Sequence, residues 1–350
     1  MKNIIVTGGA GFIGTHTCIT LLEKGYQIFV IDSFVNSSKK SLKKVLDINK
    51  SMKSQFKERL HSFEGDLNNI EFLEKVFQEI KSKHYEINGV IHFAGLKSVS
   101  ESIMYPLKYW KVNVIGTLNL LELIKKYGCK NFVFSSSATI YAPRNNIKLK
   151  ESFEIKPINP YGNTKATIEK ILSDIFNSSK GDLNLASLRY FNPIGAHPSG
   201  LIGEYPMNIP RNIFPLIVNT ALGFQKELKI YGNDYPSKDG TTVRDYIHVM
   251  DLAEIHILVL EFLMKKNGVN INLNVGTGIG TTVLELVKTF SRVNNIDVPY
   301  TFTKRRVGDI FHLVADNNLF LSKLKITPKR NIEEMCRDGW NWRKLNPKGY

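Results

Sequence analysis

The sequence predicts an α/β fold, with a doubly wound parallel sheet followed by a smaller C-terminal α/β domain. Three observations lead to this prediction. The chain opens with a buried strand, a glycine-rich turn and a helix, and strand-like and helical runs then alternate as far as about residue 195. Beyond that point the strands shorten and loops rich in proline and glycine become frequent. Repeated strand–helix units form parallel sheets, and ligands bind at the carboxyl ends of their strands. We therefore expect one domain over residues 1–195 and a second over residues 196–350, with some later segments returning to the sheet.

The first element is a strand that runs into a tight glycine turn. Residues 3–7 are a continuous apolar run, as in buried parallel strands, and Gly8-Gly9-Ala10-Gly11-Phe12-Ile13-Gly14 follows. An amphipathic helix comes next and is closed by Gly25. Glycines let the backbone approach a pyrophosphate, whose charge the N-terminus of a helix favours. The order strand, turn and helix therefore predicts a dinucleotide site.

The second strand supplies an acid for that site. Residues 27–31 form another apolar run, which ends in Asp32, about twenty residues beyond the turn. A carboxylate at this place can hydrogen-bond the 2′-hydroxyl of an adenosine ribose, and it repels a 2′-phosphate. We therefore predict NAD rather than NADP as the cofactor.

The remaining elements of the first domain follow in alternation, and the polar residues of interest lie where strands end. In chain order we expect a helix through 38–57, a strand at 60–64 ending in Gly65-Asp66-Leu67, a helix at 70–80, a strand at 89–93 ending in Ala94-Gly95, a helix at 107–127, a strand at 131–134 that delivers Ser135-Ser136-Ser137, a helix starting near Tyr161, and a strand at 185–188 ending in Arg189-Tyr190-Phe191-Asn192. The aspartate in the loop after 60–64 can meet the adenine of the cofactor.

Composition argues against several classes of protein. A chain of 350 residues can bury a substantial core, and its net charge of +15 comes largely from dispersed lysines and the segment 38–57, without an arginine-rich arm. This pattern indicates a solvated surface and not a nucleic-acid-binding protein. No apolar run approaches the ~20 residues of a membrane span, and glycines break the N-terminal run too early for a signal peptide. Three distant cysteines give neither a disulfide framework nor zinc spacing, so we expect a cytoplasmic protein without a metal site.

Tyr161 and Lys165 form the pair that points most directly to chemistry. They lie four residues apart at the start of a predicted helix, so both side chains can point into one site, and Ser137 ends the strand before them. A free tyrosine titrates near pH ~10 and is a poor base at neutral pH. A cation beside it favours the phenolate and should bring its pKa down.

Further motifs cover nearly the whole chain. They are Phe93-Ala94-Gly95-Leu96-Lys97, Phe134-Ser135-Ser136-Ser137-Ala138-Thr139, Arg189-Tyr190-Phe191-Asn192-Pro193, Gly195-Ala196-His197-Pro198-Ser199-Gly200, Tyr231-Gly232-Asn233-Asp234-Tyr235-Pro236, Asp245-Tyr246-Ile247-His248-Val249-x-Asp251-Leu252-Ala253, Arg305-Arg306-x-Gly308-Asp309, Trp340-Asn341-Trp342 and Asn346-Pro347-x-Gly349-Tyr350. Together with the glycine turn and Tyr161-x-x-x-Lys165, they resemble the extended short-chain dehydrogenase/reductase superfamily. Within it, the chain is most similar to the UDP-galactose 4-epimerase family, whose nucleotide domain is a Rossmann fold.

The resemblance implies a mechanism. Tyr161 would take the proton from the sugar 4-hydroxyl while hydride passes from C4 to the nicotinamide, and Ser137 would share that hydroxyl by a hydrogen bond. Lys165 would hold the nicotinamide ribose and depress the Tyr161 pKa. The 4-keto sugar would then present its other face, so that hydride returns with C4 inverted. The reaction would interconvert UDP-galactose and UDP-glucose and leave NAD bound.

The resemblance also implies two sets of binding residues. The NAD set, beyond the three catalytic residues, is Gly8, Gly11, Phe12, Ile13, Gly14, Asp32, Asn36, Ser37, Asp66, Leu67, Phe93, Ala94, Gly95, Lys97, Asn113 and Phe191. The UDP-sugar set is Lys97, Ser137, Tyr161, Asn192, Asn212, Tyr231, Arg244, Arg306, Asp309 and Leu313. In the second set the two arginines would clamp the diphosphate, because a guanidinium meets phosphate bidentately. Surface ion pairs are the alternative for both arginines.

Three histidines and one aspartate get structural interpretations. His92, His197 and His248 have no cysteine or histidine partner at ligand spacing, so we interpret them as packing histidines. Asp251 precedes a helical run and is expected to be its N-cap.

Some residues depart from the family pattern and bear on substrate range. Val112, Ala142-Pro143 and Val307 stand where asparagine, glycine and proline are usual in the family. Leu313 stands at the position of a sugar-pocket residue, which is tyrosine in many glucose/galactose members and small in those that accept N-acetylhexosamines. We therefore expect the plain hexoses as main substrates, with weak activity on UDP-N-acetylglucosamine.

Two rival functions remain open from the sequence. A nucleotide-sugar 4,6-dehydratase needs an acid–base pair after the strand-end serine, and Ser137-Ala138-Thr139 offers no carboxylate. An NAD-sensing regulator without chemistry typically loses the tyrosine or the lysine, and both are present here. By resemblance we also expect a homodimer, formed through a bundle of the long helices.

Overall fold

The chain folds into two compact units. The computed structural model describes residues 1–350 apart from 49–51, 145–146, 180, 208–209 and 307–308. The first unit comprises 1–140, 155–189 and 253–273, and the second comprises 141–154, 190–252 and 274–350. Both units are therefore assembled from segments that are far apart in the sequence. The expected boundary at residue 195, between a domain that binds NAD and a domain that binds the UDP-sugar, stays a prediction.

The first unit is built on a seven-stranded sheet in the order β10-β6-β5-β4-β1-β2-β3. β1 pairs in parallel with β2 and with β4, β2 with β3, and β4 with β5. The strands are β1 (Asn3–Thr7), β2 (Gln27–Asp32), β3 (Leu60–Glu64), β4 (Ile87–His92), β5 (Asn131–Ser137), β6 (Asn184–Tyr190) and β10 (Val269–Val275). The order reverses at β1 and β4, and ligands of doubly wound sheets bind outside the strand ends at such a switch point. The predicted fold class is confirmed.

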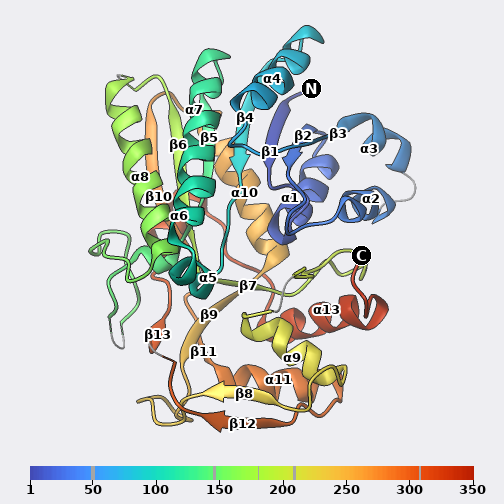
Figure 1. Ribbon diagram of the computed structural model, residues 1–350, viewed down its shortest axis with the longest axis vertical. Helices are drawn as coiled ribbons and strands as arrows, with labels where there is room; N and C mark the ends of the chain where they lie inside the picture. Colours follow the sequence, from blue (N-terminus) through green and yellow to red (C-terminus); the bar gives the residue numbers. More distant parts are fainter. Residues whose placement is uncertain (49–51, 145–146, 180, 208–209, 307–308) are drawn as a thin grey trace. The chain divides into compact units, whose positions relative to one another are not determined.

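Helices cover both faces of this sheet, as Figure 1 shows. They are α1 (Phe12–Glu23), α2 (Lys39–Ile48), α3 (Lys53–Arg59), α4 (Ile70–Ser82), α5 (Val99–Met104), α6 (Pro106–Tyr109), α7 (Gly116–Lys126), α8 (Pro160–Ser178) and α10 (Val249–Leu263), the last belonging to this unit from residue 253. One core joins α4, α7 and α8 to side chains such as Ile5 and Phe29. Side chains alternate between the two faces of a strand, so Val6 and Val30 point to the opposite face from Ile5 and Phe29. On that face they pack under the turn that leads to α1, because a Cβ on Gly9 would touch both valines.

The predicted helix over 107–127 contains a π-helical segment. α6 continues into a π-helix, η2 (Trp110–Ile115), and then into α7. Asn113 lies in the π-helix and is buried. Single π turns within helices are rare in proteins, and those that occur are often found at functional sites. The hydrophobic pattern did not show this turn, and the short helix α5 was not predicted.

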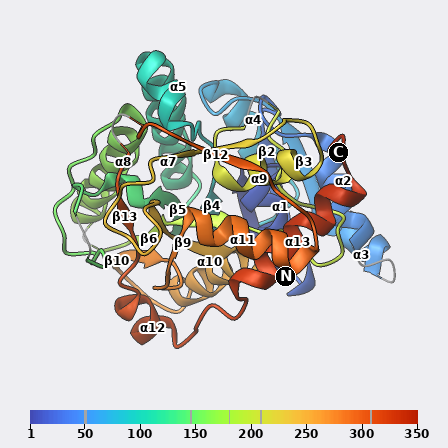
Figure 2. The same cartoon turned by 90° about the horizontal axis from the view of Figure 1, so that it is seen from below.

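The second unit contains two small sheets and four helices of its own among the residues described. Its further strands are β7 (Asn192–Ile194), β8 (Leu228–Tyr231), β9 (Val243–His248), β11 (Gly280–Thr282), β12 (Tyr300–Thr303) and β13 (His312–Leu313), and its helices are α9 (Ile213–Ala221), α11 (Val283–Asn294), α12 (Asn318–Leu324) and α13 (Ile332–Leu345). β9 pairs with β7, β11 and β13, and β8 pairs with β12. Figure 2 shows α11 and α13 side by side; their apolar faces share a core with α9.

No helix among the described residues has both the length and the apolar character needed to span a bilayer.

Candidate active site

The glycine turn after β1 leaves an open cradle at the N-terminus of α1. Gly8 has φ 68°, which glycine adopts without strain. A Cβ on Gly14 would lie 2.3 Å from the Gly8 carbonyl oxygen and 2.7 Å from the Gly9 Cα, so α1 packs directly on the turn. A Cβ on Gly11 would meet, among the described residues, only the Gly8 oxygen, at 3.3 Å. The space above Gly11 and the adjacent helix N-terminus fit the pyrophosphate of a dinucleotide.

Asp32 lies at the carboxyl end of β2 and is buried, beside this cradle. Its Oδ2 accepts the Ala10 N–H at 2.9 Å, and its Oδ1 accepts the Phe34 N–H at 2.9 Å and the Ser37 hydroxyl at 2.8 Å. These bonds fix the carboxylate between the glycine turn and the loop after β2. Each oxygen has two lone pairs, so Oδ2 retains capacity for a ribose hydroxyl.

The other predicted cofactor residues near the start of the chain lie at the start of α1 and in loops of the same unit. Phe12 and Ile13 form the first turn of α1, and Asn36 is exposed in the loop after Asp32. Asp66 is exposed, and its Oδ1 accepts the Asn68 N–H at 2.9 Å. The predicted neighbour Leu67 is buried.

The loop after β4 is braced by Asn113 from the π-helix. The Asn113 Oδ1 accepts the Leu96 N–H at 2.8 Å, and its Nδ2 donates to the Leu96 carbonyl and the Thr164 hydroxyl, each at 3.1 Å. Both amide protons are thus used within the protein. The loop carries the predicted residues Phe93, Ala94, Gly95 and Lys97. A Cβ on Gly95 would lie 3.1 Å from the Asn113 Oδ1 and 4.0 Å from the Lys165 Nζ.

The predicted catalytic residues come together between β5 and α8. Ser137 ends β5, and its Oγ accepts hydrogen bonds from the Thr139 hydroxyl (2.9 Å) and the Thr139 N–H (3.2 Å). Tyr161 hydrogen-bonds to Ser137 and is partly buried. The helix that carries Tyr161 begins with Pro160 in its first turn and Asn159 as the N-cap, whose side chain accepts the Gly162 N–H at 2.8 Å. Thr139 was not among the predicted residues.

Lys165 points into the same cluster. Its Nζ donates to the Ser135 carbonyl at 2.7 Å and lies 4.8 Å from the centre of the Phe134 ring and 5.9 Å from that of Tyr161. A lysine ammonium has three protons, so two remain for a ligand such as a ribose diol. The spacing of four residues therefore places the phenol and the ammonium on one face, as predicted.

Burial changes the acid–base properties of this cluster. Burial lowers the pKa of Lys165 to about 7, and the Glu169 carboxylate one turn further along α8 opposes that shift. Burial raises the pKa of Tyr161, and the hydrogen bond to Ser137 opposes that shift. The expectation that Lys165 brings the Tyr161 pKa down is thus not met by the residues of the chain alone, because desolvation of the phenolate dominates.

In the second unit the predicted diphosphate residues have partners of their own. The Arg244 Nη2 donates to the Asp309 Oδ1 at 2.7 Å, so two residues of the UDP-sugar set form an ion pair. The Arg306 guanidinium lies 4.0 Å from the centre of the Tyr231 ring. Leu313 in β13 is in register with Arg244 in β9. Five predicted residues are therefore grouped around the β9 edge and the end of β8.

The remaining predicted residues of the second unit are found at element ends. Asn192 begins β7, Asn212 is the N-cap position of α9, and the buried Phe191 donates its N–H to the Val275 carbonyl at 3.3 Å. Val307 and Gly308 of the arginine motif lie outside the described residues.

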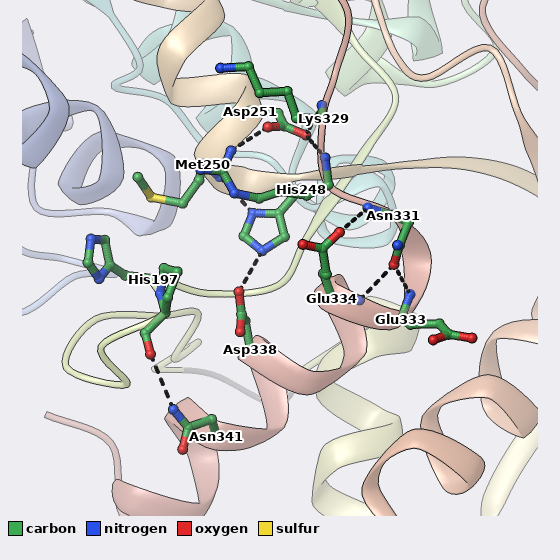
Figure 3. Close-up of polar contacts among 12 residues, drawn as sticks. His197, His248, Met250, Asp251, Lys329, Asn331, Glu333, Glu334, Asp338 and Asn341 are labelled. Carbon is green, nitrogen blue, oxygen red and sulfur yellow. Dashed lines mark hydrogen bonds and ion pairs between the residues drawn. The ribbon is translucent and has the colours of Figure 1, made fainter.

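His92 and His248 are buried and hydrogen-bonded, as interpreted, whereas His197 is only partly buried. His92 contacts the hydroxyls of Thr7 (2.6 Å) and Thr117 (2.8 Å), and burial lowers its pKa to about 3. The fully buried His248 accepts the Met250 N–H at Nδ1, so its Nε2–H donates to Asp338 at 3.2 Å (Figure 3). His197 contacts Ser199 at 2.9 Å. Among the described residues no group of three or more His, Cys, Asp or Glu side chains could hold a metal ion.

The interpretation of Asp251 was wrong. α10 begins at Val249, so Asp251 lies in its first turn and not at its N-cap. Its Oδ2 accepts the N–H groups of Lys329 (3.0 Å) and Arg330 (2.9 Å), and its Oδ1 pairs with the Arg330 guanidinium. Figure 3 shows it next to this segment, which leads to α13. Partners 78 or more residues away carry no signal in the local sequence.

By its fold and its predicted Ser137–Tyr161–Lys165 cluster, this is a protein of the extended short-chain dehydrogenase/reductase type. It matches the family model described as GDP-mannose 4,6 dehydratase over residues 5–339. It is 47% identical over 347 residues to the UDP-glucose 4-epimerase of Bacillus subtilis (strain 168), with 99% of this chain and 98% of that protein covered. The chain belongs to the UDP-glucose 4-epimerase family.

Two solved structures show the same fold over their whole length. The UDP-glucose 4-epimerase from Stenotrophomonas maltophila, with bound NAD and formylated UDP-arabinopyranose, has a TM-score of 0.92 and 38% identity, with 99% of both chains covered. The UDP-glucose 4-epimerase from Bifidobacterium longum, in complex with NAD+ and UDP, has a TM-score of 0.91 and 40% identity, with 100% of both chains covered.

Proposed function

We propose that this protein is an NAD-dependent UDP-glucose 4-epimerase that interconverts UDP-galactose and UDP-glucose. The observation that carries the proposal is the cluster of the buried Ser137 and Lys165 with the partly buried Tyr161 at the end of β5, in a unit whose glycine cradle and Asp32 fit a dinucleotide. The relatives named above support the same reaction. NAD, when bound, accepts a hydride from C4 of the sugar and returns it to the opposite face.

The side chains of the first unit manage the proton of the sugar 4-hydroxyl. Tyr161 takes this proton as the hydroxyl becomes a ketone and returns it when the alcohol is restored. Ser137 holds the same oxygen through its hydroxyl, and its own position is fixed by the two hydrogen bonds from Thr139. Lys165 offers its two remaining protons to the nicotinamide ribose and places positive charge beside the phenol.

The second unit supplies the grip on the nucleotide diphosphate. Arg244 and Arg306 are the cations for the phosphates, and Tyr231 offers a flat face for the uracil, while Asn192 and Asn212 add polar contacts. Because Arg244 is paired with Asp309, phosphate oxygens would compete with that carboxylate, which is then released for the uridine ribose. The diphosphate must stay tightly bound because the 4-keto sugar has to rotate in the site without dissociating.

The test is conversion of UDP-galactose to UDP-glucose by the purified protein without added nucleotide. We expect turnover together with NAD(H) that is released on denaturation. Tyr161→Phe should keep the bound nucleotide and lose turnover by about 10²–10⁴-fold, the usual contribution of a general acid–base group. Wild-type protein that carries NADP(H), or that converts no UDP-galactose, would overturn the proposal.

The dehydratase alternative is disfavoured by the residues after Ser137. A 4,6-dehydration needs a second acid–base pair to eliminate water from the sugar. The 3₁₀ turn Ala138–Ile140 at this place carries no carboxylate. Formation of a stable 4-keto-6-deoxy sugar from a nucleotide hexose in the same assay would favour the dehydratase.

For the partner we propose a second copy of this chain. Four large apolar side chains within residues 103–107 are exposed at α5 and α6: Ile103 (62%), Met104 (55%), Tyr105 (58%) and Leu107 (82%). An exposed apolar surface of this kind marks an interaction site, and a helix pair buries it well against its own copy. We expect sedimentation to show a dimer that Leu107→Glu dissociates and that the matched change Leu345→Glu, at the exposed end of α13, does not.

We place the protein in the cytoplasm. All three cysteines are free and buried, as suits a reducing compartment.

A further inference from the structure

A buried ion pair lies directly behind the catalytic cluster. Glu169 on α8 and Arg189 on β6 are both buried and meet in a bidentate arrangement, with Nε–Oε1 at 3.0 Å and Nη2–Oε2 at 2.6 Å. Removing two charges from water is costly, and such a pair is weak evidence for stability alone. A contribution to stability therefore does not by itself explain why this ion pair is buried behind the catalytic cluster.

The Glu169 carboxylate also holds the end of β5. Its Oε1 accepts the hydroxyl of Ser136 at 2.5 Å. Ser136 lies between Ser135, whose carbonyl holds the Lys165 Nζ, and the catalytic Ser137. Successive residues of a strand point to opposite faces, so fixing Ser136 on one side sets the direction of Ser137 on the other.

Glu169 is also one helical turn from Lys165. Residues four apart share a helix face, so the carboxylate and the ammonium lie on the same side of α8. Among the described residues, the other ionisable groups that face Lys165 are Tyr161, on α8, and His92, on β4, which its lowered pKa keeps neutral. Glu169 is thus the negative charge that supports the lysine.

We propose that Glu169 is a positioning residue of the catalytic centre, tying the end of β5 to α8 and acting as the counter-charge of Lys165, while Arg189 holds the carboxylate in place. This inference rests on the proposed roles of Ser137, Tyr161 and Lys165. It adds a fourth and a fifth residue that neither touch the substrate nor belong to the Tyr-x-x-x-Lys pattern.

The effect to measure is a change in the pH dependence of kcat. Burial already lowers the pKa of Lys165 to about 7, and loss of the Glu169 charge removes what opposes that shift. Lys165 must be protonated to act, so its deprotonation gives the alkaline limb of the profile. In Glu169→Gln this limb should move to lower pH by about one unit, a typical effect of a nearby charge inside a protein.

Two further variants separate positioning from folding. Glu169→Gln alone removes the Glu169 charge that pairs with the buried Arg189, which can unfold the protein, whereas Glu169→Gln with Arg189→Gln removes both charges of this pair together. The double variant should fold, keep its KM for UDP-galactose within about threefold, and still show a downward shift of the alkaline limb, which is smaller than in Glu169→Gln because the positive charge of Arg189 is lost as well. Glu169→Asp keeps the charge and should restore the limb toward that of the wild type. Asp174→Asn, which removes an exposed carboxylate from α8, is the matched control and should leave the profile unchanged.

The outcomes are distinguishable when Lys165→Met is measured in the same series. If Lys165→Met is inactive and the folded double variant keeps the wild-type alkaline limb, Glu169 is only structural and this inference is wrong. If Lys165→Met itself keeps the wild-type rate and profile, the proposed catalytic roles fail, independently of Glu169. A limb that moves in the double variant and returns in Glu169→Asp supports the inference.

Discussion

Two glycines of the same turn should fail in different ways when each is replaced by alanine. Gly14 lies inside α1, where alanine normally stabilises a helix by about 1 kcal/mol relative to glycine. A Cβ there would lie 2.3 Å from the Gly8 oxygen and 2.7 Å and 2.9 Å from backbone atoms of Gly9. None of these atoms is the end of a flexible side chain, so the turn itself must move.

The magnitude follows from the balance of these two effects. Overpacking typically destabilises a protein by about 1–3 kcal/mol. Because the added Cβ would come this close to rigid backbone atoms, we expect a cost of about 3 kcal/mol or more. After the gain in helix propensity, Gly14→Ala should lower the free energy of unfolding by about 2 kcal/mol. At roughly 2–4 °C per kcal/mol, the thermal midpoint of nucleotide-free protein should fall by about 4–8 °C.

Gly11→Ala is the matched control in the same turn. Its Cβ would meet only the Gly8 oxygen among the described residues, at 3.3 Å, and the φ of −74° suits any residue. The nucleotide-free thermal midpoint should fall by less than about 3 °C, since alanine is a somewhat poorer N-cap than glycine. NAD content after purification should drop instead, because the methyl group enters the cradle. A Gly14→Ala protein as stable as the wild type, or a Gly11→Ala protein with full NAD content, would refute this account of the turn.

Three further outcomes are expected. Asp245→Asn should lower the free energy of unfolding by about 3 kcal/mol, because Oδ1 of the buried carboxylate accepts the Thr277 N–H (2.8 Å) and Oδ2 accepts those of Gly278 (2.9 Å) and Ala315 (3.1 Å), so that an amide, with its single oxygen, leaves at least one buried donor without an acceptor. Chemical denaturation measures this, and a cost below about 1 kcal/mol would contradict it. Lys165→Met should alter the pH dependence of stability in nucleotide-free protein, because folding lowers the Lys165 pKa from 10.5 to about 7 and the unfolded chain therefore binds more protons between these pH values. The free energy of unfolding of the wild type should rise with pH relative to that of the variant, by up to about 1.4 kcal/mol per pH unit, and an equal pH dependence of the two denaturation midpoints, wild type and variant, would argue against the shift. Leu313→Tyr should suppress activity on UDP-N-acetylglucosamine and spare UDP-galactose, because the ring fills space that an N-acetyl group needs; an unchanged ratio of the two kcat/KM values would show that Leu313 does not line the sugar pocket.

Local sequence predicted the parts of the fold that short-range rules decide. The strand, glycine turn, helix and second strand at residues 3–32 follow from hydrophobic runs and from glycine spacing, and the structure reproduces them almost residue for residue. Tyr161 and Lys165 were placed correctly because residues four apart on a helix share a face. Asp32 and Ser137 lie at the ends of β2 and β5 because parallel strands deliver their carboxyl ends to one edge of the sheet.

Features that depend on distant partners were not predicted. The π-helix at 110–115 has the same apolar pattern as an α-helix, and its Asn113 meets Leu96 and Thr164. The partners of Asp251 lie 78 and 79 residues further along the chain. In both cases a side chain with a plausible local role is engaged by a segment that only the tertiary fold brings near.

The charge of the catalytic centre is also a tertiary property. Sequence reasoning gave Lys165 the task of lowering the Tyr161 pKa, but burial raises that pKa and lowers the pKa of the lysine as well. The same desolvation that excludes water from the cluster thus opposes both charged forms that the chemistry needs. The lysine can act on the phenol only while it stays protonated, and the Glu169 carboxylate opposes the loss of that proton. A Tyr-x-x-x-Lys pair therefore predicts where the acid–base chemistry lies, whereas we propose that the buried charges packed behind it set the pH range in which it works.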